Sequence, residues 1–233
     1  MIDKVQLLFH KKANASLEFL KEKISSEADR ITTLLPEGAI CLTAIRLEDD
    51  PTRGIAHSEE IPESAESFDA VFEIGTPNGD LNKLATRLHD VVGHLSEWIE
   101  PARSAVIAGT EHAILPGQEP LVLVMAIRRL PTMTDSAYHY YWLNKHAEVA
   151  RKVPILRAYR QFHADETATR DIAKRLTLGI ADFNGAAQGY FRDVMDFQNI
   201  MAQPEVTADA LEDEKHFIDH SRSVMGLYRI TNC

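Results

Sequence analysis

One predicted helix concentrates residue types that could carry out chemistry. In the segment YHYYWLNKHAEVARKVP, Tyr138, Trp142 and His146 follow one another at intervals of four residues, so their side chains share one helical face. A histidine has an ordinary pKa of about 6.5 and can accept or release a proton near neutral pH. The two aromatic side chains would form a flat apolar wall. This pattern favours acid–base chemistry on a small aromatic molecule, with His146 as the catalytic group.

The strand predicted to follow this helix offers polar partners. One face of that strand carries Arg157, Tyr159, Gln161 and His163, which alternate with Leu156, Ala158, Arg160 and Phe162. We expect this face to line a cleft and to bind the substrate together with Tyr138 and Trp142. The same pattern is also typical of a core histidine bonded to a backbone carbonyl, with the aromatic residues serving only as packing.

Other residue clusters point to chemistry less specifically. His216 and His220 lie four residues apart, with Glu212 one turn earlier, a spacing that could hold Zn²⁺. The segment reads HFIDH and lacks the glutamate of a zinc-protease helix. The chain has no G-x-S-x-G, no G-x-G-x-x-G and no P-loop, so serine hydrolase and nucleotide-binding functions have no support. We expect neither a metal nor a cofactor.

An internal repeat organises the chain. The segment WIEPARSAV (98–106) resembles FIDHSRSVM (217–225) at an offset of 119 residues, and the same offset sets Val71–Phe72 against Tyr190–Phe191. Such self-similarity indicates that one supersecondary unit occurs twice. The repeat predicts a first unit at residues 1–116 and a second at 117–233.

The repeated helix differs in character between the two units. Five residues of the first predicted helix and its end align with five of the second at an offset of 118 residues. They are Leu20, Ile24, Ala28, Ile31 and Pro36, which align in that order with Tyr138, Trp142, His146, Val149 and Pro154. An aliphatic face thus becomes aromatic, and His146 aligns with Ala28. This asymmetry marks the second helix as the candidate site. The change of offset from 118 to 119 indicates a one-residue insertion or deletion between the two aligned blocks.

Hydrophobic periodicity predicts the same order of elements in each unit. We expect strands at 2–10, 38–47, 68–75 and 102–112 with helices at 15–35 and 80–100, then strands at 121–129, 155–163, 186–193 and 223–231 with helices at 135–152 and 211–220. Long loops are predicted at 49–67, as an acidic surface or a lid, and at 165–184, with a short helix at 169–176. The order βαββαβ is the ferredoxin-like unit.

Two such units in one chain explain how their sheets are covered. Helices cover one face of each sheet, and leaving the other face in water costs about 25 cal/mol per Å² of apolar surface. Laying the two bare faces together removes that cost and closes a barrel with the helices outside. The predicted fold is therefore α+β: two tandem ferredoxin-like units that form an intramolecular dimeric-type α/β barrel.

The segment YYWLNKHAEVARKVPILRAY resembles the signature of the EthD family. The matching residues are Tyr141, Trp142, His146, Pro154, Leu156 and Tyr159, whereas Ile155 stands where the family usually has glycine. The resemblance implies the dimeric α/β-barrel superfamily and a cavity reached by His146. It does not imply one reaction, because relatives include accessory proteins of ether degradation, polyketide-related dehydratases and cyclases, and more distantly lactone isomerases, oxygenases and haem proteins.

Composition narrows the setting in which the chain would act. Its 233 residues carry a net charge of −10, which disfavours binding to nucleic acid or to an anionic membrane. No run of about 18 uncharged apolar residues occurs, and the N-terminus lacks the hydrophobic core of a signal peptide. Two cysteines fit a reducing compartment. We expect a cytoplasmic protein.

Three functions are compatible with these features. The first is a cofactor-free lyase or isomerase of the dehydratase type, acting on a small hydrophobic, aromatic or polyketide-like metabolite with His146 as acid and base. The second is a non-catalytic binding or accessory protein of a degradation pathway. The third is a haem protein with His146 as axial ligand. Because the repeat completes the barrel within one chain, a homodimer is allowed but not required.

Overall fold

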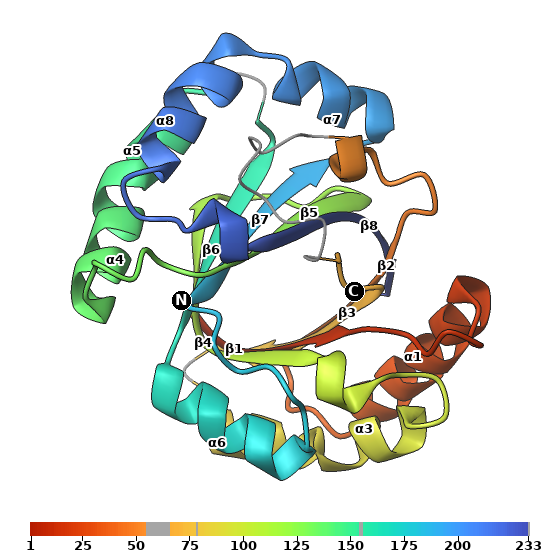
Figure 1. Ribbon diagram of the computed structural model, residues 1–233. Helices are drawn as coiled ribbons and strands as arrows, with labels where there is room; N and C mark the ends of the chain where they lie inside the picture. The colour runs from red at the N-terminus through yellow and green to blue at the C-terminus, as the bar shows by residue number, and fades with distance from the viewer. Residues whose placement is uncertain (55–65, 78, 154–155, 233) are drawn as a thin grey trace.

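A computed structural model describes residues 1–54, 66–77, 79–153 and 156–232 of the chain. In this part of the chain, antiparallel strands close a barrel in the order β1-β3-β2-β8-β5-β7-β6-β4, with the helices outside it (Figure 1). The strands are β1 (Ile2–Phe9), β2 (Ile40–Arg46), β3 (Ala70–Thr76), β4 (Ala105–Leu115), β5 (Leu121–Ile127), β6 (Ala158–Ala164), β7 (Gly185–Phe191) and β8 (Val224–Asn232). The predicted fold class is confirmed.

The helices form two layers on opposite sides of the barrel (Figure 1). The α-helices are α1 (Leu17–Thr32), α2 (Leu81–Arg87), α3 (His89–Leu95), α4 (Asp135–Tyr141), α5 (Ala147–Arg151), α6 (Glu166–Leu176), α7 (Val194–Met201) and α8 (Leu211–Glu214). Two π-helical segments, η3 (Trp142–His146) and η4 (Glu205–Ala210), precede α5 and α8. Short 3₁₀ turns are η1 (Pro51–Gly54), η2 (Pro101–Arg103) and η5 (His220–Arg222). No helix among the described residues is long and apolar enough to cross a membrane.

Two predicted helices differ from the structure. The helix expected at 80–100 is two short helices, α2 and α3, that meet at Leu88. The helix expected at 211–220 begins where predicted but is shorter, since α8 covers Leu211–Glu214 and Ile218 already pairs with Arg129. Helical structure before it begins at α7, where Asp193 caps the first turn. The short helix at 169–176 is confirmed, and begins earlier because the Asp165 side chain accepts a hydrogen bond from the third residue beyond it. Most of the acidic loop at 49–67 lies outside the described residues.

The repeat extends to individual hydrogen bonds. The Ser104 hydroxyl accepts from the amide of His10 and donates to the carbonyl of Glu100. In the second half, the Ser223 hydroxyl accepts from the amide of Arg128 and donates to the carbonyl of Asp219. Each serine therefore links the end of the first strand of its half (β1 or β5) to the turn before the last strand of that half (β4 or β8). The boundary between residues 1–116 and 117–233 stays a prediction.

The predicted alignment of β3 with β7 was wrong by four residues. Leu7 of β1 lies opposite Phe72, whereas its repeat equivalent, Met125 of β5, lies opposite Ala187. Phe72 therefore corresponds to Ala187 and not to Phe191. Side chains of a strand alternate between the two faces of the sheet, so an error of four residues leaves each side chain on the correct face. The match of Val71–Phe72 with Tyr190–Phe191 therefore predicted the face but not the register.

The inside of the barrel holds a buried charge network. The Lys4 ammonium donates to Glu73 (3.1 Å), to Glu111 and to the side-chain oxygen of Gln188 (2.7 Å). Arg160 supplies a second cation, 3.6 Å from Glu111. Lys4 and Glu73 are fully buried, and Glu111 is nearly so. Two cations thus face two carboxylates across strands β1, β3, β4 and β6, and the network ties both halves together.

Acid should weaken the barrel through Glu111. Burial raises the pKa of Glu111, but the Lys4 and Arg160 cations outweigh burial and hold this pKa below its ordinary 4.5. Such a carboxyl stabilises the fold above that ordinary pKa, and the contribution is lost as pH falls through the lower folded value. We expect the urea midpoint to fall more between about pH 6 and about pH 3 in the native chain than in Glu111→Gln. Equal falls would contradict this role.

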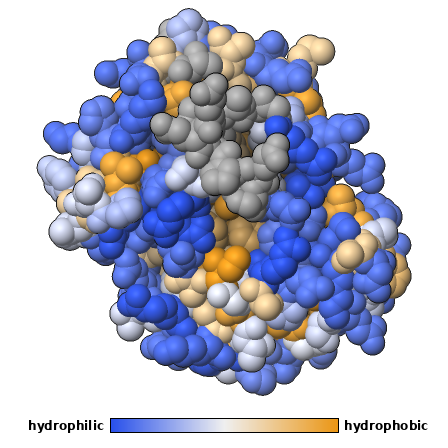
Figure 2. All heavy atoms as spheres, viewed as in Figure 1, coloured by the Kyte–Doolittle hydropathy of each residue, from blue (hydrophilic) through white to orange (hydrophobic). Residues whose placement is uncertain are grey.

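Apolar packing fills the space between the sheet and the helices. On the first-half side, Leu20, Ile24, Ala28 and Ile31 of α1 are fully buried, as the periodicity predicts. On the second-half side, the aromatic face of α4 packs against Ile127 and Phe217. Figure 2 shows hydrophilic side chains over the outer helices and hydrophobic ones gathered near the centre of one face.

Candidate functional site

The helix that carries the predicted site is interrupted by a π-helical turn. Segment η3 lies between α4 and α5, so the amide of Ala147 donates to the carbonyl of Trp142, five residues back. That carbonyl also accepts a hydrogen bond of 2.9 Å from the Gln161 side chain. Short π-helical turns are rare and occur frequently at functional sites. Gln161 thereby anchors the irregular turn to strand β6.

The π turn shifts the buried face of the helix by one residue. After Trp142, the side chain of Ala147 is fully buried and Ala150 is nearly so, whereas Val149 is partly exposed. Ala147 therefore occupies the position that corresponds to Ala28 in the first half. The expectation that His146 replaces Ala28 was wrong: His146 is an additional residue without a counterpart in the first-half helix.

His146 pairs with a carboxylate from the following helical hairpin. Its Nδ1 lies 2.8 Å from Asp213 Oδ2, its ring centroid lies 5.1 Å from that of Phe217, and its side chain is 6% exposed. A carboxylate at Nδ1 holds the proton on that nitrogen and leaves Nε2 with its lone pair. Within the described residues, Nε2 forms no hydrogen bond. The Asp213 carboxylate thus fixes the orientation of the imidazole ring.

Tyr141 completes this cluster from the other side of the carboxylate. Its hydroxyl donates to Asp213 Oδ1 at 2.7 Å. Burial and the negative Asp213 carboxylate raise the pKa of Tyr141 to about 12, so the phenol stays protonated and continues to donate. Asp213 therefore accepts from two side chains at once, and both bonds fix its orientation.

Sequence reasoning missed Asp213. It lies 67 residues beyond His146, and nothing in its neighbourhood distinguishes it from Glu212, the acidic residue considered as a metal ligand. The carboxylate of Glu212 pairs with the adjacent helical Lys215 instead. Only the packing of α8 against the π segment identifies which acidic residue meets the imidazole.

The four predicted substrate-binding residues form one buried layer between α4 and β6. The indole Nε1 of Trp142 donates to the Tyr159 hydroxyl at 3.3 Å, and the Tyr138 and Trp142 rings lie 5.5 Å apart. Tyr159 and Gln161 do share the face of β6 that meets the helix. All four side chains are buried. Their role in binding a substrate stays a prediction.

The histidine pair considered for zinc does not converge. His216 Nδ1 lies 3.1 Å from the backbone oxygens of Glu212 and Asp213, whereas His220 Nε2 lies 2.9 Å from Glu214. Within the described ranges, no three histidine, cysteine or acidic side chains are grouped so that they could hold a metal ion.

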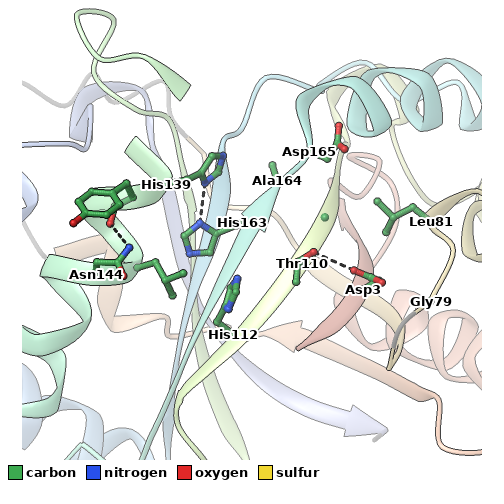
Figure 3. Close-up of a pocket in the computed structure, with 13 residues that line it drawn as sticks. Asp3, Gly79, Leu81, Thr110, His112, His139, Asn144, His163, Ala164 and Asp165 are labelled. Carbon is green, nitrogen blue, oxygen red and sulfur yellow. Dashed lines mark hydrogen bonds between the residues drawn. The ribbon is translucent and has the colours of Figure 1, made fainter. Parts of the chain in front are cut away.

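A cavity on the other side of α4 contains His163, from the predicted strand face, and two histidines that sequence reasoning did not single out. His139, His163 and His112 lie side by side there (Figure 3), and the volume is about 560 Å³. They come from α4, β6 and β4, so their sequence separation conceals the cluster. The only signal available was the position of His163 on the same strand face as Tyr159 and Gln161.

Comparison with known proteins supports the predicted resemblance. Residues 130–221 match the EthD domain family, so the resemblance is confirmed for this part of the chain. A decarboxylase, dmxR15 from Cryptosporiopsis sp. (strain 8999), is 25% identical over 114 residues, which cover 46% of this chain and 77% of that protein.

Solved structures share the whole fold at low identity. A candidate chlorite dismutase is 12% identical with a TM-score of 0.56, and the match covers 99% of this chain and 95% of that one. A candidate monooxygenase from Fusobacterium nucleatum is 13% identical with a TM-score of 0.56 and coverage of 99% and 94%. A chlorite dismutase from Candidatus Nitrospira defluvii is 11% identical with a TM-score of 0.53 and coverage of 97% and 90%. These likenesses show the fold alone.

Proposed function

We propose that this protein is a cofactor-free lyase or isomerase that binds a small aromatic or polyketide-like metabolite and uses His146 as its acid–base group. The observation that carries the proposal is the 2.8 Å contact between His146 Nδ1 and Asp213 Oδ2. A buried imidazole that serves packing alone needs no carboxylate, whereas a proton carrier gains from one that stabilises its charged form.

The decarboxylase relative narrows the lyase reaction. In such a reaction, protonated Nε2 of His146 would donate its proton to the carbon that carries the substrate carboxylate. The bond to that carboxylate would then break and release CO₂, and the neutral imidazole would regain a proton from water. Asp213 would stabilise the imidazolium before transfer and hold its ring in place. No further group has to accept electrons in this step.

Aromatic packing around His146 supports an aromatic or polyketide-like substrate. Phe217 contacts the imidazole, and Tyr141 stacks with His216 at the edge of the cluster. The hydroxyl of Tyr138 is buried and has no hydrogen-bond partner among the described residues, a costly arrangement that a polar group of a ligand would relieve. We also propose that the protein acts in the cytoplasm. The buried free thiol of Cys41 supports this, because cysteines stay reduced in that compartment.

The haem alternative does not fit the packing. A porphyrin ligated by His146 would need a flat slot between the π segment and strands β6 and β7. That layer is filled by Tyr138, Trp142 and Phe217, all fully buried. Trp142 also rests on Gly185, where even a Cβ atom would lie 2.7 Å from the indole. We therefore derive no chemistry through haem.

The acid–base role is tested by kinetics on His146→Ala. Purified protein is incubated with a panel of 2-hydroxybenzoates and aromatic β-keto acids, and CO₂ release is followed. We expect His146→Ala to lower kcat by about 10²–10⁴-fold, which is the usual contribution of a general acid or base. Asp213 positions the His146 ring and is not proposed to touch the substrate. Asp213→Asn should therefore lower kcat with little change in KM.

Two controls separate catalysis from folding. Tyr141→Phe removes one hydrogen bond from Asp213 but keeps the contact to His146, so it should lose less activity than Asp213→Asn. His89→Ala changes an exposed histidine and should behave like the native chain. A large fall in melting temperature for His146→Ala with unchanged turnover would identify a structural histidine. Panel compounds that bind but are not consumed would favour the accessory function.

A further inference from the structure

The two halves of the barrel meet at two seams, β2 with β8 and β4 with β6, and the second seam holds a cavity. Strands β4 and β6 pair there, with Thr110 opposite His163 and His112 opposite Gln161. Helix α6 of the second half packs on β4 through the hydrogen bonds between Thr169 and Ala108, and α4 faces β6 through His139 and His163. A cavity of about 560 Å³ lies at this seam (Figure 3). This volume is in the usual range for a small-molecule site. Both halves contribute to its walls, and α4 separates it from the His146–Asp213 pair.

Hydrogen bonds fix how the histidines present themselves to the cavity. The Gln161 amide donates to a backbone carbonyl, so its oxygen is the acceptor for His163 Nε2 at 3.2 Å. With the proton on Nε2, His163 Nδ1 accepts the 2.8 Å bond from His139 Nδ1. Both nitrogens of His163 are thus used within the protein. His112 forms no hydrogen bond with any described residue and is left for a ligand.

These three imidazoles are neutral near pH 7. Burial and the neighbouring His139 and His112 lower the pKa of His163 to about 3. Burial likewise lowers the pKa of His139, although Asp135 acts in the opposite direction. Burial and the N-terminal ammonium lower the pKa of His112. The histidines therefore bring hydrogen-bonding atoms and flat rings to the cavity without positive charge.

The charged groups that line the cavity are carboxylates. Asp3 and Asp165 are among the lining residues, and no lysine or arginine side chain occurs in the described lining. One oxygen of Asp3 accepts from Thr110 and one oxygen of Asp165 caps α6, so each carboxylate keeps a second oxygen without a partner among the described residues. Asn144 donates to a backbone carbonyl and keeps its own side-chain oxygen available. Among the lining side chains, acceptors and negative charge thus predominate, and the N-terminal ammonium acts on His112 from outside this lining.

We propose that this seam cavity binds a small organic cation, such as a protonated amine or amidine on a planar apolar frame. Its charged end would lie between Asp3 and Asp165, and its planar part beside His112 and Leu143. The proposal does not depend on the His146 chemistry, because no side-chain hydrogen bond, ion pair or ring contact among the described residues joins a lining residue to His146 or Asp213.

The charge preference is tested with a matched pair of probes, benzamidine and benzoate. Imidazole resonances in two-dimensional NMR spectra report binding at the seam. We expect benzamidine to shift the His112 signal with a Kd on the order of 1 mM, as suits a fragment of this size, and benzoate to leave it unchanged. Asp3→Asn keeps the side chain shape and should weaken benzamidine binding by about fivefold.

Further variants distinguish a built site from general attraction to an acidic protein. Asp165→Asn should weaken binding less, because that carboxylate is exposed, and asparagine still caps α6. Asp90→Asn, on an exposed helix away from the cavity, should have no effect. Equal binding of benzoate, an equal loss in Asp90→Asn, or no shift of His112 at about 10 mM benzamidine would overturn the proposal. Activity in the CO₂ assay is measured separately and does not bear on it.

Discussion

Replacing Lys4 with methionine should destabilise the protein by about 3–5 kcal/mol. The Lys4 ammonium is fully buried and contacts both Glu73 and Glu111. Methionine has a similar shape, so the main consequence is that two buried carboxylates lose their closest cation. Removal of one partner from a buried ion pair has costs of this size because the remaining charge stays uncompensated. Urea denaturation followed by circular dichroism measures the loss.

Two comparisons isolate the electrostatic cause. Lys21→Met removes an exposed lysine that pairs with Glu18, and its effect should stay within about 0.5 kcal/mol. Adding Glu73→Gln and Glu111→Gln to Lys4→Met removes the uncompensated charges and should recover a large part of the stability. If Lys4→Met costs less than about 1 kcal/mol, or if the added amides bring no recovery, the network does not hold the barrel together in this way.

Truncating Trp142 to alanine should also cost about 3–5 kcal/mol. The indole is fully buried, contacts the His163 ring at 4.4 Å and donates to Tyr159. Alanine would leave a cavity under the π turn, because strand β7 has only Gly185 at this point and cannot fill the space. The surrounding layer is tightly constrained, so we expect little relaxation. The free energy of unfolding in urea provides the measurement.

The other tryptophan is the natural control for this substitution. Trp98 is partly exposed and packs against Phe19 and Lys23 on the first-half surface. Trp98→Ala should cost about 1 kcal/mol or less, since solvent already reaches the ring. Similar losses in both variants would mean that the layer beneath α4 is no better packed than the surface.

Periodicity and repetition were sufficient to predict the barrel. The aliphatic face of α1 follows from the spacing of its apolar residues. The serines before β4 and β8 follow from the internal repeat, because the same turn requires the same residue in both halves. The shift of β3 against β7 could not be predicted in the same way. Side chains of a strand repeat every two residues, so a register error of four residues leaves the hydrophobic pattern intact.

The candidate site was predictable only in part. The aromatic stripe is buried against strand β6, and Tyr159 and Gln161 face the helix there. The roles of these residues and of His146 in a site stay predictions. The partner Asp213 and the cavity histidine His112 were not predictable, because both depend on how distant segments pack. Hydrogen-bond polarity around His163 also follows from neighbours that no local pattern specifies.

The additional residue in the π turn has a consequence for how this protein could have diverged from a symmetric ancestor. The first-half helix shows that the packing against the sheet is complete without any residue equivalent to His146. One inserted codon is therefore enough to bring an imidazole within reach of Asp213, while the flanking buried positions keep their partners. The barrel and this imidazole are thus genetically separable, because the residue can be gained or lost without rebuilding the core.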